Sequence, residues 1–310
     1  MAGTGPGKVV LIAGPTASGK SGMALEIARR RGGMIINADS MQVYRELRII
    51  TARPTLEEER EVPHALYGFV PAAEAYSVGR YVLDAARAIA AARKQGLLPI
   101  VVGGTGLYFK ALLEGLSPIP AIDPGVRERW RRRGDEEGPQ ALHALLRDVD
   151  PEAAQRLMPT DKQRLVRALE VAESTGRTLS AWQKEPGQPV LDEAETVRLL
   201  VVADREALMQ HIDARFDGML SAGVLEEVRD FARLGLSEEL PSVRAHGVRP
   251  LLAHLRGDLS LEEAAEGSKA ETRQYAKRQV TWHRRNMMSW RHISTQQMES
   301  YSADIFAFID

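Results

Sequence analysis

Cysteine is absent from the 310 residues, which excludes disulfide bonds and thiolate metal sites. The seven histidines show neither the H-x-H nor the H-E-x-x-H spacing of a zinc site. No apolar run approaches the roughly 20 residues that span a bilayer, and the first eight residues carry no apolar signal sequence. We therefore expect a cytoplasmic protein that does not bind membranes.

The charge is nearly balanced, with a formal net charge of −1, which argues against a uniformly basic nucleic-acid binder. Residues 269–292 are an exception, because they hold seven lysines and arginines and one glutamate. Tyr275, Trp282 and Trp290 lie between these cations, a pattern typical of proteins that bind single-stranded or loop-shaped nucleic acid. The alternative is a solvated helix face. Candidate nucleic-acid contacts in this segment are Arg273, Lys277 and Arg278.

Strand-like apolar runs alternate with amphipathic helical stretches, a pattern that predicts an α/β fold with a parallel sheet flanked by helices. The runs are Val9–Ala13, Met34–Asn37, Ile100–Val102 and Leu199–Ala203. Between residues 118 and 189 the strand signal disappears and charged helical segments dominate. We predict a catalytic core formed by residues 1–117 and 190–310, and an inserted all-helical subdomain at 118–189.

A complete phosphate-binding loop follows the first predicted strand. Gly14–Ser21 matches G-x-x-x-x-G-K-S/T and precedes a helical stretch, so the core should resemble the P-loop NTPases. The loop's backbone N–H groups and the following helix favour phosphate, Lys20 adds a positive charge, and the Ser21 hydroxyl can hold Mg²⁺. The candidate phosphate contacts are Gly14, Thr16, Ala17, Ser18, Gly19, Lys20 and Ser21. The motif alone does not distinguish a nucleoside triphosphate from another pyrophosphate.

Two further loops should meet the phosphate loop, because ligands of an open parallel sheet bind beyond the carboxyl ends of its strands. Asp39 lies just past the second strand, and Thr105 follows the third within a glycine-rich turn. Asp39 can accept a proton from a nucleophile. The alternative for both residues is a helix cap.

Asp204 ends the last strand-like run and either holds Mg²⁺ or caps the next helix. Arg205 begins that helix and Arg215 lies about three turns along it. Their planar guanidinium groups suit a leaving phosphate, unless they are simply solvated.

Six segments together resemble the tRNA dimethylallyltransferases, also called tRNA isopentenyltransferases, in the family's order and over nearly the whole chain. They are Gly14–Ser21, Asp39–Tyr44, Val62–His64, Gly103–Tyr108, Asp161–Arg167 with Ala168–Glu170, and Thr272–Gln279 with Thr281–Trp282.

The resemblance implies transfer of a dimethylallyl group from its diphosphate to the exocyclic amine of the adenosine 3′ of the anticodon. The phosphate loop would then hold an isoprenoid pyrophosphate rather than ATP. Asp39 would be the base for the amine, and Thr105 would hydrogen-bond near the transferred group. Lys20, Ser21 with Mg²⁺, and Arg215 would stabilise the departing pyrophosphate.

The resemblance also implies that a monomer grips a distorted anticodon stem-loop and that the helical insertion embraces the stem. The tRNA contacts carried over are Asp39, Ser40, Met41, Gln42, Thr105, Arg127, Gln163, Arg164, Leu165, Val166 and Arg167. Arg273, Lys277 and Arg278 of the basic segment would join them.

The chain departs from the family pattern at three places. Ile50–Pro54 stands where Gly-Thr-Ala-Lys-Pro is usual, and Ala65 replaces a second histidine after His64. Arg53 keeps the charge of the usual lysine without its geometry. Ala245–Arg249 replaces an Ile-Gly-Tyr-Lys type of segment.

Two other functions fit the phosphate loop. In a small-molecule kinase ATP would be the donor and Asp39 would activate a hydroxyl. A nucleotide-switched binding protein is disfavoured, because no N-K-x-D guanine-reading segment occurs. The basic aromatic segment and the helical insertion favour tRNA as the acceptor.

Overall fold

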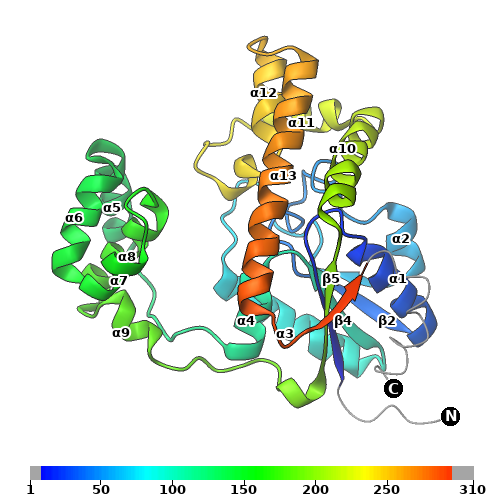
Figure 1. Ribbon diagram of the computed structural model, residues 1–310, viewed down its shortest axis with the longest axis horizontal. Helices are drawn as coiled ribbons and strands as arrows, with labels where there is room; N and C mark the ends of the chain where they lie inside the picture. Colours follow the sequence, from blue (N-terminus) through cyan, green and yellow to red (C-terminus); the bar gives the residue numbers. More distant parts are fainter. Residues whose placement is uncertain (1–7, 295–310) are drawn as a thin grey trace. The chain divides into compact units, whose positions relative to one another are not determined.

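The computed structural model describes residues 8–294, and its core is a sheet of six parallel strands in the order β3-β2-β4-β1-β5-β6 (Figure 1). The predicted parallel sheet is confirmed. The strands are β1 (Val9–Ala13), β2 (Gly33–Asn37), β3 (His64–Ala65), β4 (Leu98–Gly103), β5 (Thr196–Val202) and β6 (Arg291–Ser294). The sequence did not predict β3 and β6, which span only two and four residues.

Strand β4 lies between β1 and β2, although β2 follows β1 in the chain. Gly103 at the end of β4 is in register with Ala13 at the end of β1. Val102 of β4 is in register with Asn37 at the end of β2. The loops that follow these three strands therefore leave the same edge of the sheet side by side.

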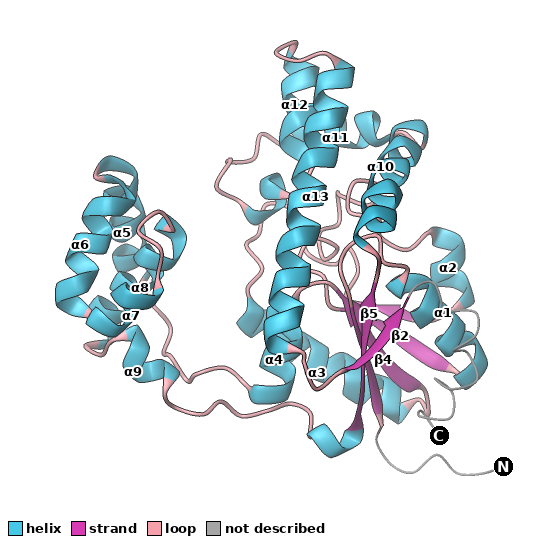
Figure 2. Cartoon of the chain, viewed as in Figure 1, coloured by secondary structure: helices cyan, strands magenta, loops and turns pink. Residues whose placement is uncertain are grey.

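Helices cover both faces of the sheet (Figure 2). The core helices are α1 (Lys20–Arg31), α2 (Leu56–Glu61), α3 (Val78–Lys94), α4 (Gly106–Glu114), α10 (Arg205–Ser221), α11 (Val224–Ala232), α12 (Val248–Arg256) and α13 (Leu261–Asn286), with 3₁₀ turns η1 (Glu193–Glu195) and η2 (Pro241–Arg244). The long helix α13 begins with a capping box formed by Ser260 and Glu263. Asp204 accepts hydrogen bonds from the backbone N–H groups of Glu206 and Ala207. Of its two predicted roles, a Mg²⁺ ligand or a helix cap, the structure therefore shows the helix cap of α10.

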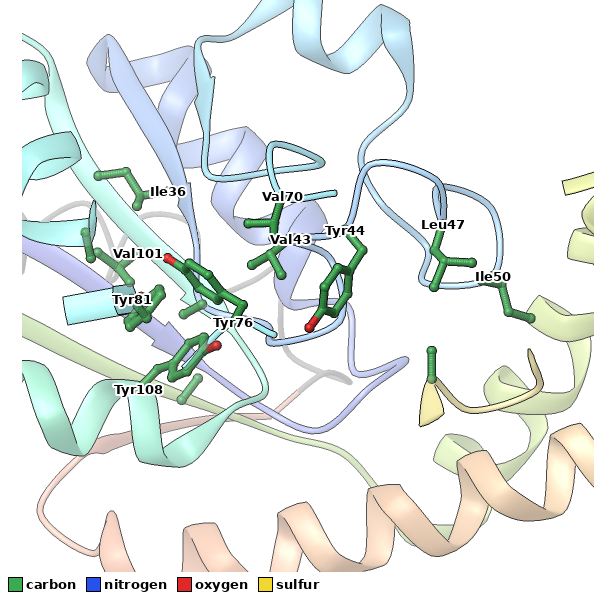
Figure 3. Close-up of a cluster of buried hydrophobic side chains, with 14 of the residues drawn as sticks. Ile36, Val43, Tyr44, Leu47, Ile50, Val70, Tyr76, Tyr81, Val101 and Tyr108 are labelled. Atoms are coloured by element: carbon green, nitrogen blue, oxygen red, sulfur yellow. The ribbon is translucent and has the colours of Figure 1, made fainter. Parts of the chain in front are cut away.

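Successive residues of β1 pack into two different hydrophobic clusters. Leu11 belongs to the cluster on one face of the sheet, whereas Val10 and Ile12 belong to the cluster on the other face, beneath α1. All five residues of β1 are buried because a parallel sheet is covered on both sides. In the first cluster the rings of Tyr81 and Tyr108 stack with centroids 3.7 Å apart (Figure 3).

A second unit, Glu114–Pro189, packs around its own core. It begins four residues before the predicted insertion. All of its residues are described, and the only regular secondary structure among them is helical. Its helices are α5 (Pro124–Glu136), α6 (Gly138–Val149), α7 (Pro151–Arg156), α8 (Lys162–Thr175) and α9 (Leu179–Gln183). Leu142, Leu146 and Leu169 are among its buried side chains.

Within residues 8–294, no helix has the length and apolar character needed to cross a membrane.

Candidate active site

The phosphate loop joins β1 to α1 through a backbone that turns sharply. Ala17 and Gly19 adopt left-handed conformations, with φ of 62° and 79°. Gly19 occupies the N-cap of α1 without a side-chain cap, and the first helical turn contains no acidic residue. The backbone N–H groups at the positive end of this helix therefore remain available to bind an anion.

Lys20 is buried within this loop, with 9% of its surface exposed. Its Nζ donates a hydrogen bond to the carbonyl oxygen of Pro15 at 3.2 Å. Burial lowers the pKa of Lys20 to about 8; Asp39 raises this pKa and Arg215 lowers it. A bound phosphate would supply an opposite charge that favours the protonated form of Lys20, which burial disfavours.

The two serines of the loop present hydroxyl groups. Ser18 is 1% exposed, and its Oγ has no hydrogen-bond partner among the described residues. A buried hydroxyl of this kind is costly unless a ligand or water pairs with it. Ser21 lies exposed in the first turn of α1, and its side chain is not hydrogen-bonded to any residue within 8–294.

Arg215 reaches the phosphate loop from α10. Its Nη2 donates a hydrogen bond to Thr16 Oγ1 at 2.5 Å. Burial lowers the pKa of Arg215, and the Asp39 carboxylate raises it. Arg205, at the start of the same helix, is exposed and makes no such contact in the described structure. Of the two predicted arginines, the structure brings only Arg215 to the loop.

Asp39 is fixed by a buried asparagine that the sequence did not single out. Asn37 Oδ1 accepts a hydrogen bond from the Asp39 backbone N–H at 2.8 Å, and Asn37 Nδ2 donates to the Asp39 carbonyl at 2.9 Å and to the Leu66 carbonyl at 3.0 Å. Asp39 Oδ1 accepts from the Met41 N–H at 2.9 Å, and no helix follows Ser40. Asp39 therefore closes a local turn and is not a helix cap.

The Asp39 carboxylate lies among both cations and tyrosines. It is a charged neighbour of Lys20 and of Arg215. Burial raises the pKa of Tyr108 and of Tyr275, and in both cases the Asp39 charge is the next largest cause. The charge of Asp39 therefore acts both on the cations at the phosphate loop and on these two tyrosines.

Thr105 ties the loop after β4 to the loop after β2. Its Oγ1 accepts a hydrogen bond from the Ser40 N–H at 3.0 Å, and its own N–H donates to the Ala38 carbonyl at 3.1 Å. Thr105 is therefore positioned next to the Asp39 turn.

Gln279 of α13 completes the site, and sequence reasoning gave it no role. Its Oε1 accepts from the Thr16 N–H at 2.9 Å, and its Nε2 donates to the Gly104 carbonyl at 2.9 Å. The sequence drew attention to Gln279 only as a member of the last of the six segments that resemble the family. No local pattern shows that this glutamine is buried while the cations around it are exposed.

The remaining candidates of the core unit have different environments. Ser40 and Met41 are half-buried, and Gln42 Nε2 donates to the carbonyls of Thr51 and Ala52 at 2.9 and 3.2 Å. Arg273 pairs with Asp213 at 2.7 Å and with Glu266, so its charge is already compensated. Its assignment as a tRNA contact stays a prediction. The other two candidates on this helix, Lys277 and Arg278, are exposed and form no ion pair with another residue of the described range.

The inserted unit carries the other predicted tRNA contacts. Arg127 and Arg167 both face the buried carboxylate of Glu170, at 3.7 and 2.7 Å. Gln163 and Arg164 are exposed, but Leu165 and Val166 are 0% and 7% exposed within the core of this unit. The predicted contacts of Leu165 and Val166 are therefore wrong for their side chains, because consecutive residues of a helix point in different directions.

Comparison with known proteins identifies the family. The IPP transferase family model matches residues 42–286, and the isopentenyl transferase model matches residues 7–65. The tRNA dimethylallyltransferase of Parvibaculum lavamentivorans is 52% identical over 304 residues, covering 98% of this chain and 96% of that protein. That of Nitrobacter hamburgensis is 53% identical over 307 residues, covering 97% of each.

Solved structures give the same result. The tRNA isopentenylpyrophosphate transferase of Bacillus halodurans matches with a TM-score of 0.68 and 32% identity, over 97% of this chain and 96% of that one. A eukaryotic dimethylallyltransferase acting on tRNA matches with a TM-score of 0.80 and 29% identity, over 95% of this chain and 75% of that one. The phosphate loop, the Asp39 turn and the Thr105 loop thus occur on a chain that belongs to the IPP transferase family.

Proposed function

We propose that this protein is a tRNA dimethylallyltransferase. It transfers the dimethylallyl group of dimethylallyl diphosphate to the N6 amine of the adenosine adjacent to the 3′ side of the anticodon, releasing diphosphate. The carrying observation is that a fixed carboxylate, Asp39, lies beside the cations of a phosphate-binding loop. The names of the similar proteins from Parvibaculum and Nitrobacter support the same activity.

In the proposed reaction, a bond forms between adenine N6 and C1 of the dimethylallyl group. The bond between C1 and the diphosphate oxygen breaks, and its electron pair leaves with the diphosphate. The proton lost from N6 passes to the Asp39 carboxylate. A positioned general base contributes about 10²- to 10⁴-fold to the rate.

Negative charge develops on the leaving diphosphate, and the phosphate loop opposes it. Lys20 and Arg215 supply positive charge, and the uncapped N-terminus of α1 supplies backbone donors. Because these groups are fixed before the reaction, they stabilise the transition state without reorganising. Gln279 and Thr105 hold the loops in place and do not take up protons in this scheme.

Mg²⁺ fits this loop as a cation held mainly by its substrate. The described residues contain no cluster of three histidine or carboxylate side chains that would form a protein cage for a metal. Ser21 offers one exposed hydroxyl at the start of α1. Mg²⁺ commonly takes one or two protein ligands together with phosphate oxygens and water. When bound, it would neutralise diphosphate charge, with Ser21 as its protein ligand.

The tRNA requires a surface beyond the reaction site. On α13 we assign the exposed cations Lys277 and Arg278 to its backbone. In the inserted unit we assign Arg127, Arg164 and Arg167, of which Arg127 and Arg167 also face Glu170. The target adenosine must leave its stack to bring N6 to Asp39.

The test is transfer of labelled dimethylallyl from its diphosphate to unmodified tRNA, with Mg²⁺ and without ATP. We expect label in tRNA that carries adenosine 3′ of the anticodon, and none in a matched tRNA that carries guanosine there. Absence of incorporation, together with ATP consumption on a panel of small alcohols, would overturn the proposal in favour of a kinase.

A further inference from the structure

The backbone that follows Asp39 is paired with a second loop of the core unit. Residues 39–45 run alongside residues 66–70, and Val43 and Val70 of the two segments lie side by side in Figure 3. Three backbone hydrogen bonds, of 2.9, 3.0 and 2.9 Å, join them: Gly68 N–H to the Gln42 carbonyl, Val70 N–H to the Val43 carbonyl, and Arg45 N–H to the Val70 carbonyl. The position of the Asp39 segment therefore depends on residues 66–70.

Arg53 contacts both of these segments. Its side chain is 7% exposed, and its Nη1 donates to the carbonyls of Tyr44 and Arg45 at 3.3 and 3.2 Å. The same guanidinium lies against the backbone of Gly68, where a Cβ atom would be 2.0 Å from Nη1 and 2.1 Å from Cζ. Arg53 thus occupies the space that a side chain at position 68 would need, and joins the two segments there.

Stability alone does not explain a charge at this position. Within the described residues the ion-pair partner of Arg53 is Glu59, 3.8 Å from Nη2, and Glu59 also binds Arg48 at 3.0 Å. The Nε of Arg53 is buried and has no hydrogen-bond partner there. A buried charge that is incompletely paired costs free energy, and apolar side chains of similar volume are often as stable or more so. The arginine is therefore better explained by the backbone that it holds in place.

Backbone strain accompanies this contact. Leu66 has φ of 65°, and Ala52, directly before Arg53, has φ of 53°. The described residues other than glycine that have positive φ are Ala17, Ala52 and Leu66. The Leu66 carbonyl accepts from Asn37 Nδ2, the amide that also binds the Asp39 carbonyl. Strain of this kind persists only where the surrounding contacts over-determine the backbone, and it clusters at functional sites.

We propose that Arg53 is a positioning residue for the transfer reaction. By lying on Gly68 and binding the carbonyls of residues 44 and 45, it holds the Asp39 segment against residues 66–70 and so fixes the carboxylate relative to the phosphate loop. This inference rests on the proposed function, in which Asp39 accepts the N6 proton. Arg53 itself contacts no reacting atom. The inference gives a role to the segment Ile50–Pro54, in which this chain departs from its family.

The test is the single-turnover rate of transfer with donor and tRNA both saturating, so that changes in affinity do not enter. Arg53→Met keeps the apolar stem of the side chain and removes the guanidinium. We expect the rate to fall about 10²-fold, the effect of misplacing a reacting group by about 1 Å. Arg53→Lys can still donate to the carbonyls, so its rate should lie between those of Arg53→Met and wild type. Pyrophosphate affinity, which reports on the phosphate loop, should be unchanged.

The decisive result is the coupling between Arg53 and Asp39. Because Arg53 acts through the carboxylate, Arg53→Met should cause no further loss of rate in the Asp39→Asn background. General damage to the fold would slow both backgrounds by the same factor. If the two losses multiply, Arg53 does not act through Asp39 and the inference is wrong.

Gly68→Ala tests the same contact from the other side. Its methyl group would displace the guanidinium, so transfer should slow in the wild-type background and much less in Arg53→Met. The matched control is Gly96→Ala, where φ is 70° and no atom lies within 4 Å of the added Cβ, so the backbone strain is similar without the collision. Equal rates for Gly68→Ala and Gly96→Ala would exclude the contact. If Arg53→Met does not fold, Gly68→Ala and Arg53→Lys carry the test, each combined with Asp39→Asn.

Failure of this inference is distinguishable from failure of the proposed function. If the wild-type protein does not transfer dimethylallyl, or Asp39→Asn transfers at the wild-type rate, the proposed role of Asp39 fails and the role of Arg53 with it. If Asp39→Asn is slow while Arg53→Met and Gly68→Ala transfer at the wild-type rate, only the role of Arg53 is lost.

Discussion

Gln279 Oε1 accepts a hydrogen bond from the Thr16 backbone N–H at 2.9 Å, across 263 residues of sequence. Through its Nε2 the same side chain donates to the Gly104 carbonyl at 2.9 Å. Gln279 is 5% exposed, so these backbone groups have little access to water. One amide of α13 therefore holds together the phosphate loop and the loop that carries Thr105.

Replacing Gln279 by alanine should destabilise the protein and weaken its phosphate site. Two buried backbone groups would lose their partners, so we expect the free energy of unfolding to fall by about 2 kcal/mol, together with a loss of pyrophosphate affinity. Gln279→Glu keeps an acceptor for Thr16 but turns a carboxylate toward the Gly104 carbonyl and the bound anion. Pyrophosphate affinity should therefore fall further in Gln279→Glu than in Gln279→Ala.

Urea unfolding and calorimetric titration with pyrophosphate provide the measurements. Gln210→Ala, at an exposed position of α10, is the matched control and should change the unfolding free energy by less than about 0.5 kcal/mol. Wild-type stability and affinity in Gln279→Ala would show that this bridge does not organise the site.

Asp39→Asn should abolish most transfer while preserving both substrates' binding. The asparagine side chain retains an oxygen for the Met41 N–H, so the turn should persist, but its amide cannot take the N6 proton. We expect kcat to fall by about 10²- to 10⁴-fold. Single-turnover transfer gives the rate, and stem-loop affinity serves as the control for folding. A variant with the wild-type rate would remove Asp39 as the base.

Arg215 and Thr16 should act as one unit. Arg215→Gln removes a positive charge from the leaving diphosphate and should lower kcat/KM by roughly 10²- to 10³-fold, the range seen for loss of a transition-state donor. Thr16→Val removes only the oxygen that orients the guanidinium at 2.5 Å, so its effect should be smaller. The double variant should be no slower than Arg215→Gln, since the threonine acts through the arginine. Additive losses in steady-state kinetics would show that they act independently.

The sequence was sufficient to predict the elements with strong local patterns. Val9–Ala13 is apolar throughout and is the strand expected, and the phosphate loop has the uncapped helix start that its motif predicts. Strands β3 and β6 gave no signal because two or four residues hold too little pattern, and their pairing depends on neighbours distant in sequence.

What the sequence could not predict at the site depends on tertiary contacts. The charge of residues 269–292 predicts a nucleic-acid surface, but the pairing of Arg273 with Asp213 of α10, 60 residues away, has no local signal. The resemblance implied that all residues from 163 to 167 contact tRNA. These residues lie on a helix, whose period turns the side chain of Leu165 into the core. Asn37 and Gln279 were missed because their importance comes from the backbone groups that they reach, which only the fold defines.

His283 should make stability depend on pH in a measurable way. It is 2% exposed, and burial, followed by the charge of Lys20, lowers its pKa from 6.5 to about 4. Between these values the unfolded chain binds a proton at His283 that the native protein does not bind. Acidification below pH 6.5 therefore favours unfolding, by up to about 1.4 kcal/mol per pH unit from this residue, and the effect ends below pH 4.

His283→Phe keeps a flat ring in the core without a titrating group, so the variant should lose less stability than the wild-type protein between pH 7 and 4.5. Urea unfolding at several pH values gives this difference, and subtracting the two curves cancels the groups that both proteins share. His211→Asn, at an exposed position of α10, is the control and should follow the wild-type curve. Parallel curves for His283→Phe and wild type would show that His283 takes up its proton equally in the folded and unfolded states.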